Sequence, residues 1–156
     1  MAYYSIPGKP PWNRAVADLA SAVEDDDAIF YAPSYAWWPL AYYAGRLSDA
    51  APPDSVADAR KRLIIAGVEL HPLDHALPNL DLRGLDQVDE VAGGTRRAWV
   101  IFRNREWIDP DGAALARLRD LGTVTLHARY SRQRPSLFRS EIETYLVTSR
   151  GRVSPE

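Results

Sequence analysis

The first apolar residues of the chain recur with the period of an amphipathic helix. They fall at i, i+4, i+7, i+8 and i+11, and they are Trp12, Val16, Leu19, Ala20 and Val23. This spacing predicts a helix with Pro10 and Pro11 at its first turn, where proline is tolerated. The run 28–32 is apolar and aromatic throughout, which predicts a strand that is buried on both faces and ends at Pro33.

The middle of the chain alternates between helical patterns and shorter apolar runs. It predicts helices over 38–47, from Asp54 or Ser55 through 62, and over about 82–91. The run 63–70 predicts a second strand, whose limits the pattern leaves open, and 98–102 predicts a third strand that is apolar on both faces. Residues 72–80 contain two prolines and are expected to form an irregular connection.

A last helix and two alternating strands complete the pattern. Asp109 is expected to cap a helix that has Pro110 at its first position and that ends at Gly122. The buried side of this helix is expected to comprise Ala113, Leu115, Ala116, Leu118 and Leu121. The runs 123–128 and 142–147 alternate, so each predicts a strand with one less buried face. Residues 149–156 are expected to form a flexible tail.

Alternating helices and continuous apolar strands predict one α/β domain over residues 10–148. We expect a three-layer arrangement of the Rossmann-like or flavodoxin-like type. Its sheet should be mostly parallel, with about five strands and an antiparallel edge strand at the C-terminal end.

Composition narrows the class of protein. Of the 156 residues, 46% are hydrophobic and 26% are charged, which excludes a largely disordered chain. The net charge of -2 argues against a nucleic-acid partner. Because the chain has no cysteine, a disulfide scaffold, a thiolate zinc site and a cysteine nucleophile are excluded. The richest apolar run, 35–45, is about half the length that a membrane-spanning helix needs.

The loop after the first predicted strand carries aromatic residues where a nucleotide site would need glycines. Parallel sheets bind ligands beyond the carboxyl ends of their strands, and residues 32–38 form the first such loop. Since this loop has no glycine, we do not expect dinucleotide binding. The candidate ligand-binding residues, suited to stacking on a sugar or at a membrane interface, are Ser34, Tyr35, Trp37, Trp38 and Tyr42. The alternative is that some of these rings fill the core.

No set of residues in the sequence assembles a metal site or a catalytic triad. His71 and His75 have the i, i+4 spacing of ligands on a helix, but Pro72 and Pro78 oppose a regular helix there. We interpret both histidines as surface residues of a turn and expect no metal and no cofactor. His127 is interpreted as structural, and a Gly-x-Ser-x-Gly motif is missing.

The charged residues have structural interpretations as well. Residues 24–27 are expected to form a solvated acidic corner, and Asp109 and Asp111 to cap a helix. The predicted loop between the last two strands is basic, with Arg129, Arg132, Arg134 and Arg139. It suits phosphates or anionic head groups, although scattered surface arginines are the commoner outcome.

Four segments taken in order resemble a known family. They are 10–16 (PPWNRAV), 27–33 (DAIFYAP), 39–46 (PLAYYAGR) and 97–101 (RAWVI). Together they are similar to the soluble C-terminal domain of multi-spanning GT-C type glycosyltransferases, of the protein-mannosyltransferase kind that use polyprenyl-phosphate sugars. The resemblance runs from about residue 3 to residue 147, and its motifs are structural rather than catalytic.

The resemblance implies a location and a role. In that family the domain follows a bundle of membrane helices and lies on the extracytoplasmic face of the plasma membrane. It also implies that residues 1–9 are a linker from such a membrane region. The family's catalytic aspartates lie in the membrane part, so no catalytic residue is expected here. The implied partners are the preceding transmembrane domain and a glycan or lipid-linked sugar.

The sequence therefore leaves three hypotheses. The first is a non-catalytic accessory domain that contacts an acceptor glycan or the membrane domain through the loop at 35–38. The second is a free-standing enzyme on a Rossmann-like scaffold, which would bind a small anionic ligand through Ser34 or a nearby arginine. The third is an interaction module whose aromatic patch docks a partner protein.

Overall fold

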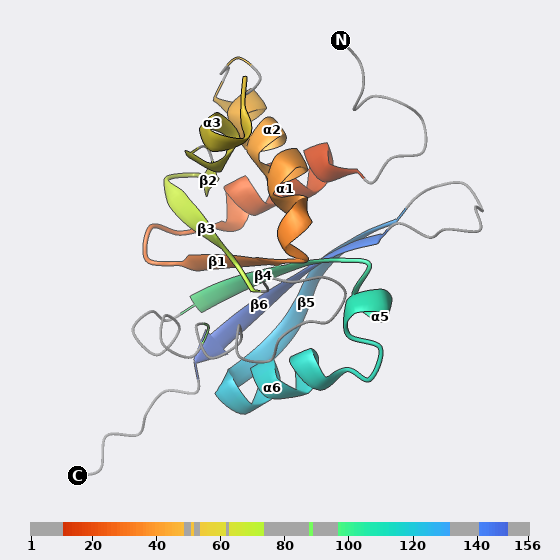
Figure 1. The fold of residues 1–156 in the computed structure, drawn as a ribbon. Coiled ribbons are helices and arrows are strands. Elements are labelled where there is room, and N and C mark those ends of the chain that lie inside the picture. Colours follow the sequence, from red (N-terminus) through yellow and green to blue (C-terminus); the bar gives the residue numbers. More distant parts are fainter. Residues whose placement is uncertain are drawn as a thin grey trace.

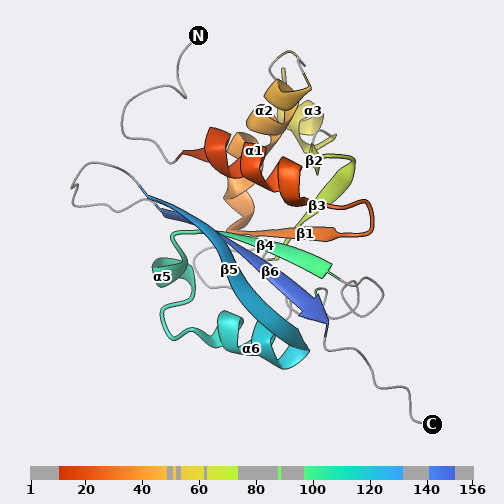
Figure 2. The same cartoon turned by 180° about the vertical axis from the view of Figure 1, so that it is seen from behind.

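A mixed β-sheet organises the chain, with helices against both of its faces (Figures 1 and 2). The computed structural model describes residues 11–48, 51, 54–61, 63–73, 88, 97–131 and 141–149. Within these residues the sheet has six strands in the order β2-β3-β1-β4-β6-β5. Helices α1, α2 and α3 lie on one face, α6 lies on the other, and α5 lies where β4 ends. The predicted α/β class is confirmed.

The elements follow the predicted order. The helices are α1 (Trp12–Ala22), α2 (Trp37–Leu47), α3 (Val56–Lys61), α5 (Arg105–Ile108) and α6 (Ala113–Leu121), with a 3-10 turn, η1 (Ser34–Ala36), before α2. The strands are β1 (Ala28–Ala32), β2 (Ile64–Ile65), β3 (Val68–Pro72), β4 (Arg97–Arg103), β5 (Gly122–Ser131) and β6 (Glu141–Ser149).

Parallel pairing is confined to the centre of the sheet. β1 pairs in parallel with β3 on one side and with β4 on the other. β2, β6 and β5 are all antiparallel to their neighbours. The expected antiparallel addition at the C-terminal end is present, but it has two strands, and β6 lies between β4 and the edge strand β5. β2 and β3 follow each other directly in the chain, and such strands can pair antiparallel without a crossover.

β1 and β4 are apolar on both faces because each separates two buried clusters. Alternate residues of β1 and β4 point to opposite faces of the sheet. Ile29, Tyr31 and Trp99 lie in the cluster beneath α1 and α2. Phe30 and Phe102 lie in the second cluster, which α6 covers with Ala114, Leu115 and Leu118. Burial on both faces explains why these runs lack the polar alternation of a surface strand.

The predicted second strand is in fact a hairpin of two short strands. β2 and β3 pair antiparallel, with Ile65 opposite Val68. The two residues between them, Ala66 and Gly67, both have positive φ, at 50° and 81°. A two-residue turn with positive φ at both positions matches the twist of the strands that it joins. Alanine is not typical of the first position, so the sequence gives little indication of this turn. β3 also extends to Pro72, a residue that we had assigned to the irregular connection.

The helix predicted from Asp109 begins later, at Ala113. The Asp109 carboxylate still caps it, because it accepts hydrogen bonds from the backbone N–H groups of Ala114 (3.0 Å) and Leu115 (3.4 Å). No cap bond of Asp111 is seen in the described residues. A short helix that the sequence pattern missed, α5, precedes this cap. Four residues are too few to show a helical period.

The edge strand β5 is long and bent. It pairs with β6 along its whole length, with a shift of register between Leu126 and Ala128 that leaves His127 in a bulge. Its first residue, Gly122, packs directly on β6, where a side chain would collide with the carbonyl oxygen of Thr148. The His127 ring stands edge-on to Trp99, with ring centroids 4.9 Å apart, which agrees with a structural role.

The acidic corner at 24–27 is not wholly solvated, which corrects our expectation. Asp27 is only 8% exposed. Its Oδ2 atom accepts hydrogen bonds from the Arg97 guanidinium (2.8 Å), the Trp99 indole (2.8 Å) and the backbone N–H of Glu24 (2.9 Å). β1 and β4 start side by side. The Asp27 carboxylate, just before β1, therefore joins the start of β1 to the start of β4. Glu24 itself stays exposed, while it pairs with Arg97.

A second polar contact joins α1 to the edge of the sheet. The Tyr130 hydroxyl of β5 donates a hydrogen bond to the Asp18 carboxylate of α1. Burial, and then this hydrogen bond and the Asp18 charge, raise the pKa of Tyr130 well above its ordinary value. The neutral phenol is therefore the form that the folded chain favours.

Several expectations fall outside the described residues. These are the linker 1–9, the helix over 82–91 apart from Val88, the basic residues Arg132, Arg134 and Arg139, and the tail beyond Ser149. Val88 itself is helical and fully buried in the α6-side cluster. Among the described helices, none combines the length and the apolar character that crossing a membrane requires.

Candidate functional site

The candidate site lies at the carboxyl edge of the parallel strands. β1 and β4 are neighbours and run in parallel, with Ala32 opposite Phe102 at their ends. The chain leaves β1 towards α2 on one face and leaves β4 towards α5 and α6 on the other side (Figure 1). A crevice is expected where two adjacent strands send their connections to opposite faces. The loops at 33–36 and 104–105 border this position.

A pocket of about 570 Å³ opens beside this edge, between β1, β3 and the start of α2. Its size is within the range of small-molecule sites. Its lining comes from Tyr31, Ser34, Tyr35, Trp37, Leu63, Glu69, Leu70, His71 and Pro72. The pocket therefore combines aromatic and aliphatic surface with a few polar groups.

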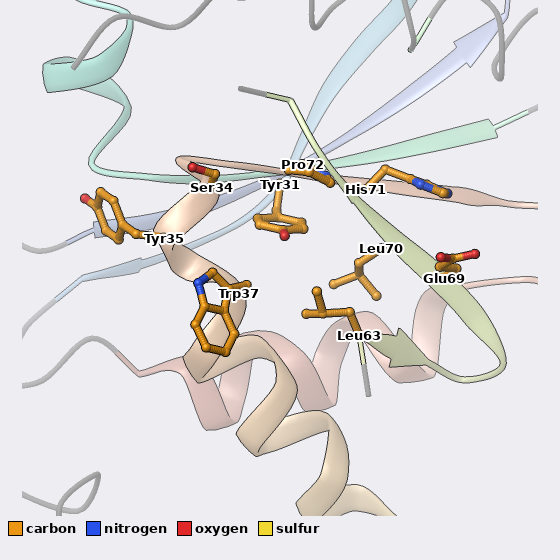
Figure 3. Close-up of a pocket in the computed structure, with 9 residues that line it drawn as sticks. All are labelled: Tyr31, Ser34, Tyr35, Trp37, Leu63, Glu69, Leu70, His71 and Pro72. Carbon is orange, nitrogen blue, oxygen red and sulfur yellow. The ribbon is translucent and has the colours of Figure 1, made fainter. Parts of the chain in front are cut away.

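The close-up shows which side chains face the space (Figure 3). Tyr31 and Leu70 point into it from β1 and β3, Leu63 completes one wall, and Trp37 borders it from α2. Tyr35 lies at one end and points away, and it is 40% exposed.

Two polar residues of β3 contribute less to the interior than their presence in the lining suggests. Glu69 and His71 alternate with Leu70 along the strand, so their side chains leave its opposite side, as Figure 3 shows. His71 contacts the Phe30 ring there, with centroids 5.7 Å apart. It is thus a half-buried strand residue and not the surface turn residue that we expected.

Three of the five candidate residues meet at the pocket. Ser34, Tyr35 and Trp37 line it, whereas Trp38 and Tyr42 do not. Trp37 and Trp38 are both half-buried, pack against the core cluster under α2, and stand edge-on to each other with centroids 5.3 Å apart. Packing and ligand contact are therefore not exclusive for Trp37. Ligand binding by these five residues stays a prediction.

Arg103, at the end of β4, was not among the candidates. Its guanidinium lies over the Tyr35 ring, 5.4 Å from the centroid. Its Nε atom is buried and has no hydrogen-bond partner. No carboxylate pairs with it among the residues that the structure describes, so stacking on the ring holds it in place. The sequence around Arg103 does not indicate that its side chain contacts Tyr35.

Below the edge, on the α6 side, lies a buried carboxylate that the sequence pattern also missed. Glu143 accepts hydrogen bonds from Arg105 (3.3 Å), from Arg129 (3.4 Å) and from the Tyr145 hydroxyl. Arg129 also pairs with Glu141 at 2.6 Å, so it belongs to strand β5 and its ion pairs and not to a basic loop. The cluster fastens α5 to β5 and β6.

The charges of this cluster set the protonation states of its members. Burial raises the pKa of Tyr145, and the hydrogen bond to Glu143 raises it further. Burial acts to lower the pKa of Arg105, but Glu143 and Tyr145 together raise it above its ordinary value. The charge of Glu143 likewise raises the pKa of Arg129. Among the described residues, no group of three or more histidine, aspartate and glutamate side chains is placed to hold a metal ion.

Comparison with known proteins adds nothing to this description. No protein family model matches the chain, and neither a curated protein nor a solved structure matches it. What the site does is therefore inferred from its own geometry and chemistry.

Proposed function

We propose that the chain is a non-catalytic, glycan-contacting domain of a polyprenyl-phosphate-sugar-dependent glycosyltransferase. In this proposal the domain lies on the extracytoplasmic face of the plasma membrane, next to the transmembrane part that carries out the transfer. The sequence resemblance motivates this assignment. The observation that carries it is the pocket at the carboxyl edge, which the Tyr31 and Trp37 rings border and at whose end Tyr35 lies.

The chemistry of the lining fits a neutral sugar. Tyrosine and tryptophan combine a flat apolar face with a polar edge, which matches the C–H face and the hydroxyl rim of a pyranose or furanose ring. Ser34 is also among the lining residues, and its hydroxyl is a further hydrogen-bond donor and acceptor. We also infer that the ligand binds beyond the carboxyl ends of the parallel strands, as it does in Rossmann-like, three-layer sheets.

The test is titration of the 156-residue chain with neutral hexoses, pentoses and disaccharides. Tryptophan fluorescence and NMR chemical shifts detect the binding. We expect weak, saturable binding that shifts resonances of Tyr31 and Trp37. Trp37→Ala should abolish the binding. Leu47→Ala, at the far end of the same helix and 52% exposed, should leave it unchanged. Absence of saturation with every sugar, or binding that survives Trp37→Ala, would contradict the proposal.

One observation favours the second candidate, a free-standing protein that binds a small anionic ligand. Arg103 lies at the same edge, stacks on Tyr35, and has no carboxylate partner in the described part of the chain. An arginine so placed suits a phosphate or carboxylate group. Calorimetry with nucleotides and phosphorylated metabolites tests this candidate. Binding that is lost in both Arg103→Gln and Ser34→Ala would favour it over the glycan proposal.

A further inference from the structure

Trp107 is the most exposed large apolar side chain in the described part of the chain. It is 67% exposed, against 52% for Leu47, 48% for Ile64, 42% for Leu126 and 40% for Tyr35. Isolated apolar residues on a surface are common, but tryptophan is the residue that loses most by such exposure. Trp107 contributes little to either core cluster, so its position calls for another explanation.

The backbone around Trp107 is fixed on both sides. Asn104 adopts a left-handed conformation (φ 52°), its N–H donates to the Glu141 carbonyl (2.8 Å), and its side-chain oxygen accepts from the Glu141 N–H (2.9 Å). Arg105 is held by the buried Glu143. Asp109 then fixes the way into α6. The exposed indole thus stands on a short helix that is tied down before and after it.

Trp107 and the pocket belong to the same edge of the sheet. Ala32 and Phe102 are opposite each other, so the residues that follow them leave the sheet together. Arg103 then reaches across to the Tyr35 ring, and α5 begins two residues later. Tyr35 points away from the pocket (Figure 3), and α5 lies at the end of β4 in both views of the fold. The exposed Tyr35 ring and the helix that carries the exposed Trp107 therefore both lie at this edge.

We propose that Tyr35 and Trp107 form two further stacking positions for a glycan chain that starts in the pocket. This proposal rests on the proposed function and extends it from a single sugar to an oligosaccharide several units long. The charged groups along this edge have both signs: Glu106, exposed and adjacent to Trp107 in α5, and Arg103, whose guanidinium lies over the Tyr35 ring. Carboxylates accept hydrogen bonds from sugar hydroxyls but repel nucleic acids and anionic membranes. Because sugar hydroxyls both donate and accept hydrogen bonds, a surface that offers a carboxylate and a guanidinium suits a neutral polyhydroxylated ligand.

The experiment measures affinity against chain length. The 156-residue protein is titrated with one homologous series of neutral oligosaccharides, from disaccharide to hexasaccharide, by calorimetry. We expect affinity to rise with length and then to level off. Trp107→Ala should lower hexasaccharide affinity about two- to tenfold, the usual effect of one aromatic stacking partner, and leave disaccharide affinity unchanged. Tyr35→Ala should act at an intermediate length.

The controls separate this proposal from the proposed function. Leu126→Ala, exposed on β5, should change no affinity, and the urea midpoint of Trp107→Ala should match that of the parent chain. If disaccharides bind through Trp37 but length adds nothing, the extended site is wrong while the pocket proposal stands. If longer chains bind more tightly but Trp107→Ala has no effect, the glycan does not stack on Trp107 and the proposal is overturned. If no sugar of any length binds, both proposals are overturned.

Discussion

Replacing Asp27, a buried carboxylate that joins the starts of β1 and β4, is expected to destabilise the fold strongly. Its side chain is 3% exposed, and one oxygen accepts three hydrogen bonds, from Arg97, Trp99 and Glu24. Asp27→Ala leaves the Trp99 indole N–H without a partner in the core and the Arg97 guanidinium with only its outer contacts. Because Arg97 is 23% exposed and keeps its contacts with Glu24 and the Ala22 carbonyl, Asp27→Ala should cost about 2–4 kcal/mol, most of it from the unpartnered indole N–H. Asp27→Asn keeps an acceptor but loses the charge, so its cost should be about 1.5–3 kcal/mol.

Urea denaturation followed by tryptophan fluorescence measures these costs directly, because Trp99 is one of the groups affected. The matched control is Glu24→Gln, which removes the other carboxylate that Arg97 contacts. That side chain is 68% exposed, so its loss should cost under about 1 kcal/mol. The reasoning fails if Asp27→Ala costs no more than Glu24→Gln, or if Asp27→Asn is as damaging as Asp27→Ala.

Three further predictions concern other elements. The pKa of Tyr130 is raised in the folded chain, so the tyrosine of the unfolded chain loses its proton at lower pH. The free energy of unfolding should therefore fall above about pH 10. Urea titrations between about pH 7 and 11 should show this fall, and a less steep one in Tyr130→Phe. Gly122→Ala should destabilise the chain by about 1–3 kcal/mol or prevent folding, since its Cβ meets the backbone carbonyl of Thr148; equal melting temperatures would contradict this. Asp109→Ala should cost about 1–2 kcal/mol through the lost α6 cap, while Asp111→Ala, with no such bond in the described residues, should change thermal stability by under about 0.5 kcal/mol.

The parts of the fold that were predictable are those whose cause is local. The helical period from Trp12 places α1, and the continuous apolar runs place β1 and β4 at the centre of the sheet. A strand that is buried on both faces has an unbroken run of apolar residues, which can be recognised in the sequence. The order of the elements along the chain therefore followed from the sequence.

The parts that were missed depend on partners distant in the sequence or on very short elements. Asp27 and Arg97 are 70 residues apart, so nothing near Asp27 indicates that it is buried. The β2–β3 hairpin turns at Ala66, a residue that seldom adopts positive φ, and α5 is shorter than the pattern that would reveal it. In the site, the loop with Ser34, Tyr35 and Trp37 was found from its position after a strand. Arg103 reaches Tyr35 only because β1 pairs with β4, a long-range contact that the sequence near Arg103 does not indicate.

The bulge at His127 has a consequence for how copies of this chain behave at high concentration. β5 is ten residues long, and within the described residues nothing pairs with its outer edge. A straight edge of that length is a template on which a second molecule adds a strand, which is how fibrils begin. The bulge twists β5 halfway along its length. Arg129, two residues after His127, places a positive charge on the same strand, and charges also oppose edge-to-edge pairing. Deleting His127 would remove the bulge, and the variant is expected to aggregate at lower concentration than the parent chain.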